Sequence, residues 1–364
     1  MYRSVIMAVM LLALACKPES GRQPSDTTDP AAGPVSTTDS AKRGFVAVVN
    51  AGPVASAQGN PNRVPNELGR IMVIEYHLIG DKNTTYSRER ASFRQDLELL
   101  YERGYRPVSM AQVLDRRIDL PRGLSPVVFT LDDASPGQFS YVEKDGKLEI
   151  DPRSGLGIWL DFRKTHPDWD NNAVFCLLSG AEAGHNFFGD KNIQGQKTAW
   201  RFTKVKWLAD NGFELCNHTV WHAQLSKYPD VFVQEQIARL AMSVDSAVPG
   251  YKMRSMALPQ GLWPKNRALA SKGTWTDPRS KRTVSYGYDA VFEVAGGPAR
   301  SPYDPAFNPL STPRIQVIGN AIERTMDRLE KSGNMYISDG NPATIARPAV
   351  AAPTSSTTPP ARKR

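Results

Sequence analysis

The segment Pro126-Val127-Val128-Phe129-Thr130-Leu131-Asp132-Asp133 decides the fold class, because a mostly apolar run without alternation leads into two adjacent carboxylates. A short continuous apolar run is typical of a strand that is buried on both faces, as in a parallel sheet. Parallel barrels and doubly wound sheets carry their chemistry at the carboxyl ends of such strands. We therefore predict a buried parallel strand over 126–131, with Asp132 and Asp133 at a candidate site.

Similar apolar runs recur along the chain and are separated by amphipathic segments. Further strands are predicted at 71–76, 173–178, 213–216, 255–258, 290–294, 315–317 and 335–338. Helices are expected from a capping box at Ser92–Gln95 to Gly104, over 198–211, and from Asp230 to Pro249. Strands that alternate with amphipathic helices indicate an α/β fold with a parallel sheet covered by helices. Both a closed barrel and an open doubly wound sheet have this alternation.

The two ends of the chain differ in composition from the middle. Residues 17–65 are rich in Pro, Ser, Thr and Gly, and residues 347–364 in Pro, Ala, Ser and Thr. Such segments bury too little apolar surface to offset their ordering entropy, so we predict a disordered linker and a disordered tail. The folded domain is expected at 66–346.

The first residues have the pattern of an export signal. Arg3 precedes an apolar run from Val5 to Ala15 that is too short to span a bilayer as a stable helix. Small residues followed by Cys16 resemble a bacterial lipoprotein cleavage site, so 1–16 is interpreted as a lipoprotein signal peptide. We expect an exported protein, anchored in the bacterial cell envelope through a lipid on Cys16. The alternative is an ordinary secretory signal with an incidental cysteine.

Charge and cysteine content narrow the class further. The net charge is +8, but Lys and Arg are scattered and form no nucleic-acid motif, so no nucleic-acid partner is expected. The positive charge favours weak attraction to anionic envelope polymers. Cys176 and Cys216 lie in apolar stretches and are interpreted as buried small hydrophobes, with a disulfide as the alternative in an oxidising compartment.

The segment His218-Thr219-Val220-Trp221-His222 follows the strand predicted at 213–216. Histidines at i and i+4 share one face if the segment turns helically, and neutral imidazoles are good ligands for zinc and similar metals. One carboxylate of the pair at 132–133 could complete such a site, and the other could take a proton from water. Taken singly, each pattern also fits an ordinary strand-end loop, because Asp commonly starts turns.

In combination, the motifs resemble those of one family. Thr130-Leu131-Asp132-Asp133-Ala134 resembles the Thr-Phe-Asp-Asp-Gly motif of the polysaccharide deacetylases, also called carbohydrate esterase family four. Residues 217–222 are similar to that family's His-Ser/Thr-x-x-His motif. Leu258-Pro259-Gln260-Gly261 resembles the end of its Arg-Pro-Pro-Tyr-Gly motif, and Ile74-Glu75-Tyr76-His77 resembles its first strand. The resemblance covers residues 70–345.

The resemblance implies a distorted (β/α) barrel with mainly parallel strands and one divalent metal ion. Zinc is the first candidate, with cobalt or nickel as alternatives. Asp133, His218 and His222 would be the metal ligands, and Asp132 would be the catalytic base. The backbone N–H of Gln260 would help to bind the oxyanion. The implied substrate is an acetylated polysaccharide or peptidoglycan, which would lose acetate from N-acetylated or O-acetylated sugars.

Two departures from the family pattern concern catalysis. The family's arginine in the third motif, which orients the base, is replaced by Ala257. Either Arg254 or Arg314 could substitute, and we favour Arg314. The late histidine that serves as general acid is also missing, so His77 and Asp339 are the candidates for that role.

These departures leave alternative functions open. The same scaffold could bind glycans without hydrolysing them, or hydrolyse a non-sugar amide or ester. A long insertion at 134–172 contains Trp159 and Phe162. We expect it to form a helix that packs its aromatic face on the barrel; the alternative is a lid that stacks on sugars.

Overall fold

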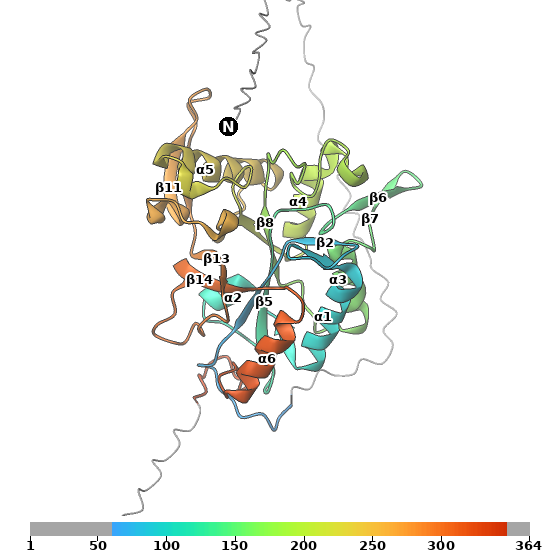
Figure 1. Cartoon of the computed structure of the whole chain (residues 1–364), viewed down its shortest axis with the longest axis vertical. Helices are drawn as coiled ribbons and strands as arrows, with labels where there is room; N and C mark the ends of the chain where they lie inside the picture. The colour runs from blue at the N-terminus through green and yellow to red at the C-terminus, as the bar shows by residue number, and fades with distance from the viewer. Residues whose placement is uncertain (1–59, 348–364) are drawn as a thin grey trace, which may run out of the picture. The chain divides into compact units, whose positions relative to one another are not determined.

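Parallel strands form the centre of the structure. The computed structural model describes residues 60–347, and seven of its strands close into a ring because β1 pairs with both β14 and β5 (Figure 1). In ring order they are β1 (Met72–Tyr76), β14 (Thr312–Gln316), β13 (Ala290–Gly296), β10 (Ser255–Ala257), β9 (Glu214–Asn217), β8 (Ala173–Leu177) and β5 (Ser125–Leu131). An eighth strand, β4 (Tyr105–Pro107), pairs with β5 outside the ring. The predicted distorted (β/α) barrel is confirmed, and the open-sheet alternative is wrong.

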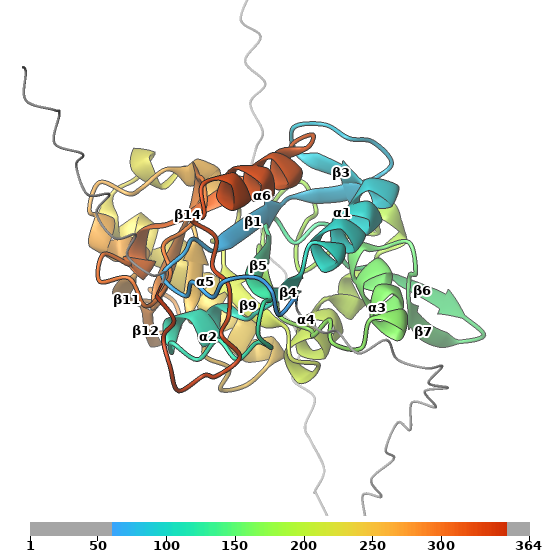
Figure 2. The same ribbon diagram turned by 90° about the horizontal axis from the view of Figure 1, so that it is seen from below.

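The strands lack alternation because both of their faces are covered. All seven residues of β5 are buried. Val73, Val128 and Val174 belong to one apolar cluster, whereas their chain neighbours Met72 and Val127 belong to another that includes the helices. Six helices surround the strands, as the view from below shows (Figure 2). They are α1 (Arg90–Glu102), α2 (Met110–Leu114), α3 (Gly155–Thr165), α4 (Arg201–Asp210), α5 (Asp230–Ala247) and α6 (Ala321–Lys331).

Short strand pairs and 3₁₀ turns accompany the barrel. Three pairs of short strands lie outside it: β2 (Leu78–Gly80) with β3 (Ser87–Glu89), β6 (Tyr141–Lys144) with β7 (Lys147–Ile150), and β11 (Lys272–Thr276) with β12 (Thr283–Gly287). Short 3₁₀ turns occupy Ile193–Gly195, Thr198–Trp200, Leu225–Lys227, Pro259–Gly261, Arg267–Ala270 and Pro309–Ser311. The hairpin β6–β7 projects from the body of the domain (Figure 1).

The insertion at 134–172 forms this hairpin and α3. Trp159 and Phe162 of α3 are buried, and the ring of Trp159 meets that of Phe129 in β5 at 4.9 Å between centroids. The helix therefore packs its aromatic face on the barrel, as expected, because these large rings bury most of their area there. Both rings are covered by the core, so they do not form a lid.

Three details of the predicted elements are wrong. Helix α1 begins at Arg90, and its N-cap Glu89 makes no side-chain cap bond, so the capping box at Ser92–Gln95 does not exist. Strand β14 begins at Thr312 rather than at residue 315. Residues 335–338 make isolated bridges to the loop before β1 instead of a barrel strand. A short apolar run fits either environment, and the ring is already closed without a further strand.

Cys176 and Cys216 are linked by a disulfide. They are direct register partners on the neighbouring strands β8 and β9, and both are buried. The alternative that the sequence left open is therefore the one observed, and the interpretation as free hydrophobes is wrong. The crosslink joins β8 to β9, the strand that ends directly before His218.

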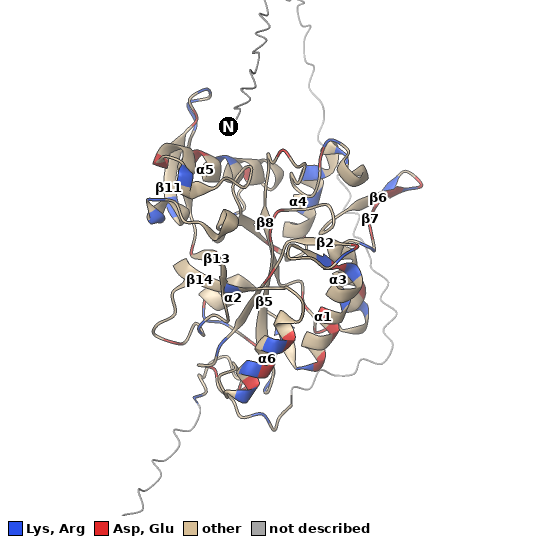
Figure 3. Ribbon diagram, viewed as in Figure 1, with Lys and Arg blue, Asp and Glu red and all other residues tan. Residues whose placement is uncertain are grey.

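Several expectations concern residues outside the described range. The signal at 1–16 with Cys16, nearly all of the linker at 17–65, and the tail beyond residue 347 are among them, so these remain predictions. Within residues 60–347, none of the helices is long and apolar enough to cross a membrane. Acidic and basic residues are intermingled along α1, α3 and α6 (Figure 3), which agrees with the scattered charge of the sequence.

Candidate metal and acid-base site

The candidate site lies where parallel barrels carry their chemistry, at the carboxyl ends of the strands. Asp132 and Asp133 directly follow β5, and His218 directly follows β9. His77 directly follows β1. Arg314 projects from within β14, which pairs with β1. Ring closure therefore brings together side chains that are far apart in the sequence, such as Glu75 and Arg314, which are separated by 239 residues.

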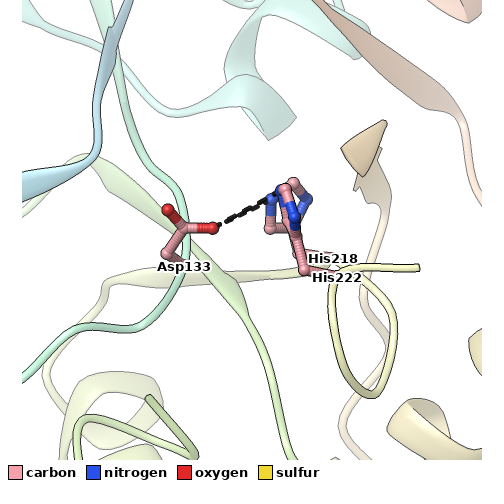
Figure 4. Close-up of side chains that lie close together, drawn as sticks. All are labelled: Asp133, His218 and His222. Carbon is pink, nitrogen blue, oxygen red and sulfur yellow. Dashed lines mark ion pairs between the residues drawn. The ribbon is translucent and has the colours of Figure 1, made fainter. Parts of the chain in front are cut away.

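Asp133, His218 and His222 converge on one point (Figure 4). Asp133 Oδ1 lies 3.5 Å from Nε2 of His218 and 3.7 Å from Nε2 of His222. Atoms that bind one tetrahedral ion at about 2.1 Å each lie about 3.4 Å apart. The three side chains are thus spaced as ligands of a single small cation.

The two imidazoles do not converge through a helical turn, which corrects the sequence interpretation. Residues 218–222 form a loop, in which Thr219 has φ 71° and His222 has φ 65°. Asn217 Oδ1 accepts from the backbone N–H of Thr219, and Thr219 Oγ1 accepts from that of His222. These side-chain bonds hold a backbone conformation that non-glycine residues rarely adopt.

The ring of His218 is fixed in one tautomer. Its Nδ1 lies 2.9 Å from the carbonyl oxygen of Ala257, so Nδ1 carries a proton and donates it to this hydrogen bond. Its Nε2 is buried and has no hydrogen-bond partner. A metal-ligating histidine typically uses its second ring nitrogen in this way, bonded to a carbonyl. The orphaned Nε2 and the acceptor set Asp/His/His fit zinc, cobalt or nickel.

Charge interactions keep the cluster ready to bind a cation. Burial alone would raise the pKa of Asp133, but the neighbouring imidazoles of His218 and His222 outweigh burial and lower it. Burial, together with the charge of His218, lowers the pKa of His222 to about 4. At neutral pH Asp133 is therefore a carboxylate and His222 an uncharged imidazole. At His218 the effect of burial is outweighed by the carboxylates of Asp132 and Asp133, which raise its pKa, so binding of an ion there would displace a proton.

Asp132 stays outside this ligand cluster and is held by Arg314. The guanidinium donates from Nη1 and Nη2 to the two carboxylate oxygens of Asp132, each at 2.8 Å. Burial alone would raise the pKa of Asp132, but the charges of Arg314 and His218 outweigh burial and lower it. Asp132 is thus an ionised carboxylate, oriented by a bidentate pair. The structure favours Arg314 over Arg254 as the replacement for the missing motif arginine.

Two further candidates lie elsewhere. Arg254 is partly exposed and pairs with Asp115 and Asp289. Asp339 accepts from the backbone N–H of Asn341 and from the hydroxyl of Thr344, and it contacts no residue of the site. Asp339 is therefore wrong as a general acid.

His77 lies close to Asp132, and Gln260 lies in the turn that follows β10. His77 Nε2 is 3.4 Å from Glu75 Oε1, and burial lowers the pKa of His77. Gln260 has φ 58° in the turn that follows β10, three residues after the carbonyl that binds His218. The roles of both residues remain proposals.

Sequence reasoning missed two residues of the site. Glu75 is a buried charged residue inside an otherwise apolar strand, and that anomaly in the sequence could have revealed it. Gln138, from the insertion, donates to the backbone carbonyls of both His77 and Asp132. No sequence pattern indicated that a residue six positions after Asp132 turns back to it.

A cavity of about 510 Å³ opens beside the cluster. Its lining includes Asp133 and His222 of the cluster, together with Leu178, His185 and Trp221. Trp221 is 42% exposed, which leaves part of its ring available to a ligand. The combination of apolar walls and a few polar groups is typical of a small-molecule site.

Residues 170–274 match the sequence profile of the family described as "Polysaccharide deacetylase". Over this segment the chain resembles the polysaccharide deacetylase family. The matched segment contains both histidines and the turn at Gln260, and the Asp pair precedes it. No curated protein matches the chain.

Two solved structures are similar in fold to this chain. The first is the deacetylase PplD of Streptococcus pyogenes in complex with acetate, with a TM-score of 0.50 and 18% identity over 71% of this chain and 98% of PplD. The second is IcaB of Ammonifex degensii, with a TM-score of 0.49 and 19% identity over 72% of this chain and 97% of IcaB. At this level of identity, the likeness to PplD shows the fold alone.

Proposed function

We propose that this protein is a divalent-metal-dependent polysaccharide deacetylase that removes acetyl groups from an exported or cell-envelope polysaccharide. N-acetylated sugars are the first candidate substrates, and O-acetylated sugars are the second. The observation that carries the proposal is the convergence of Asp133, His218 and His222 beside Asp132, a carboxylate that lies outside the ligand cluster. PplD has a similar fold, and its structure is a complex with acetate. Acetate would be the product of the reaction proposed here.

Asp133, His218 and His222 would hold the ion, with zinc as the first candidate. A divalent ion in such a site lowers the pKa of water and polarises a carbonyl oxygen. The chain's own contribution is to present one anionic oxygen and two imidazole nitrogens in a nearly tetrahedral spacing. Ala257, through its carbonyl, keeps Nε2 of His218 free for this purpose.

Asp132 would accept the proton of the attacking water. Both terminal nitrogens of Arg314 hold this carboxylate in one orientation. A carboxylate that is already oriented loses little conformational entropy in the reaction. Its low pKa makes it a weak base, which suffices when the water is itself acidified.

Gln260 and His77 would complete the reaction. The backbone N–H of Gln260 would donate to the oxyanion of the tetrahedral intermediate, a contribution often worth about 2.7–4 kcal/mol. His77 would donate a proton to the leaving amine, in place of the family's late histidine. Its side chain is 14% exposed, so a substrate can reach it.

Location is part of the proposal. An export signal at 1–16, a lipid on Cys16 and the linker at 17–65 would tether the domain to the bacterial envelope. Acetylated envelope glycans or peptidoglycan would then be within its reach. The net charge of +8 favours attraction to anionic envelope polymers.

A glycan-binding protein without turnover is the second candidate. Two departures support it: Ala257 in place of the motif arginine, and the missing late histidine. The first departure does not weaken the case for hydrolysis, because Arg314 takes the place of the motif arginine and donates directly to Asp132. A hydrolase of a non-sugar amide or ester would use the same residues and differs only in the occupant of the cavity.

Acetate release from defined N-acetyl and O-acetyl glycans, measured after loading with zinc, cobalt or nickel, tests the proposal. Asp132→Asn should abolish release while the metal content stays the same. Asp96→Asn is a matched control, because Asp96 is also buried and paired with an arginine, Arg88, but lies outside the cluster. Sugar binding without turnover by the wild type on every glycan would establish the second candidate instead.

A further inference from the structure

Glu75 is a buried charge in the barrel that the proposed chemistry leaves unused. It lies in β1, and its side chain is completely shielded from solvent. Burying a carboxylate is costly unless charged or hydrogen-bonded partners compensate. The partners of this one are two site residues: Oε1 lies 2.9 Å from Nη2 of Arg314 and 3.4 Å from Nε2 of His77.

The same guanidinium thus serves two carboxylates. Nη2 of Arg314 donates to both Glu75 and Asp132, and Nη1 donates to Asp132 as well. Glu75 therefore limits the positions in which Arg314 can hold the base. On its other side, Glu75 faces the imidazole of the proposed acid, His77.

The second oxygen of Glu75 sets it apart from a simple structural ion pair. Oε2 is buried and has no hydrogen-bond partner. Burial, with the nearby carboxylate of Asp132, raises the pKa of Glu75 to about 9 in spite of the opposing charge of Arg314. A buried polar atom without a partner among the described residues calls for an explanation.

A second cation site does not explain the arrangement. Ligand atoms of Glu75, His77 and Asp132 lie within 4.8 Å of one another, as a metal would require. However, Arg314 donates to both of these carboxylates, so its guanidinium already supplies the positive charge there.

We propose that Glu75 is a positioning residue that joins the base and the acid of the site, by holding Arg314 against Asp132 and by holding the imidazole of His77. This inference rests on the proposed function. Glu75 touches neither the metal ligands nor the cavity, so it acts on catalysis through its two partners. A carboxyl group beside an imidazole orients the ring.

A double-mutant cycle with His77 tests the inference. Glu75→Gln keeps the shape of the side chain and leaves Arg314 paired with Asp132. We expect kcat to fall at least tenfold, with KM within twofold and metal content unchanged. In the His77→Ala background, the same substitution should lower kcat by a factor at least five times smaller, because one of its two partners is already gone.

Glu67→Gln is the matched control. Glu67 is also buried, but it accepts from Tyr336 and from the backbone N–H groups of Asp339 and Ala346, away from the site. This substitution should leave kcat unchanged in both backgrounds. If Glu75→Gln fails to fold, Glu75→Asp replaces it, since a side chain one methylene shorter withdraws the carboxylate from His77.

The outcomes separate the inference from the proposed function. A metal-loaded wild type that releases no acetate from any acetylated glycan overturns the proposed function, and the inference with it. An active wild type, with Glu75→Gln lowering kcat by the same factor in both backgrounds or not at all, overturns the inference alone. Loss of the effect of Glu75→Gln in the His77→Ala background supports it.

Discussion

Replacing Arg314 by methionine would remove the one group that compensates two buried carboxylates. All five N–H groups of this arginine donate: Nε to the carbonyl of Glu293, Nη1 to Thr130 and Asp132, and Nη2 to Asp132 and Glu75. Methionine fills a similar length of apolar stem and offers none of these donors. Removing one partner of a buried ion pair costs about 3–5 kcal/mol, because the other charge is left uncompensated.

The loss should therefore appear in both stability and catalysis. We expect the free energy of unfolding of Arg314→Met, from urea titrations, to fall by about 3–5 kcal/mol. Acetate release should fall by about a hundredfold or more, since a positioned general base typically contributes at least that factor. Both measurements need the metal-loaded protein, because bound metal also stabilises the fold.

Arg254→Met is the control that distinguishes the two arginines. Arg254 is partly exposed and pairs with Asp115 and Asp289, so its removal should cost less than about 1 kcal/mol and leave acetate release unchanged. The reasoning is refuted if Arg314→Met is as stable and as active as the wild type, or if Arg254→Met is the more damaging change.

Three further predictions follow from other parts of the fold. Reduction of the disulfide between Cys176 and Cys216, which are 40 residues apart in the sequence, should lower the free energy of unfolding by about 4 kcal/mol; equal urea midpoints with and without reductant would contradict this. Burial lowers the pKa of Lys204 to about 7 from 10.5. The unfolded chain then binds more protons than the folded one between these values, so stability should rise by roughly 3–4 kcal/mol from pH 7 to pH 10. Lys204→Met should abolish that part of the slope, and identical slopes in the two proteins would disprove the assignment. Gln138→Leu leaves the carbonyls of His77 and Asp132 without this donor, so unfolding should become easier by about 1–3 kcal/mol for each carbonyl that stays unpaired. An unchanged melting temperature would show that Gln138 plays no such part.

The fold was predictable because the buried strands keep their apolar composition along the whole chain. The run at 126–131 and the segments around 74, 174 and 215 all became ring strands, since a parallel sheet covered by helices buries both of their faces. The run at 335–338 has a similar composition and pairs only through isolated bridges. Composition alone does not distinguish a strand from a buried loop, which depends on the partners available in three dimensions.

The ligand cluster was predictable from motifs, but its local geometry was not. Asp133, His218 and His222 converge as the resemblance implied, yet through a loop with positive φ at Thr219 instead of a helical turn. That conformation depends on hydrogen bonds that the side-chain oxygens of Asn217 and Thr219 accept from backbone N–H groups, which no spacing rule indicates.

The supporting residues required the closed ring. Arg314 was favoured as a substitute for the motif arginine only by its place before a strand, and the pairing of β14 with β1 is what aims it at Asp132. Glu75 joined the site for the same reason. Contacts across 182 and 239 residues follow from the tertiary fold, and sequence patterns carry only local information.

The central claim is that three side chains hold one cation beside a carboxylate that takes no part in holding it. Titration of the metal-free protein with cobalt(II), followed by the visible absorption of the bound ion, tests this most directly. We predict one equivalent bound by the wild type and by Asp132→Asn, and no such binding by His218→Ala, His222→Ala or Asp133→Ala. Equal cobalt binding by the wild type and Asp133→Ala, or its loss in Asp132→Asn, would contradict the account.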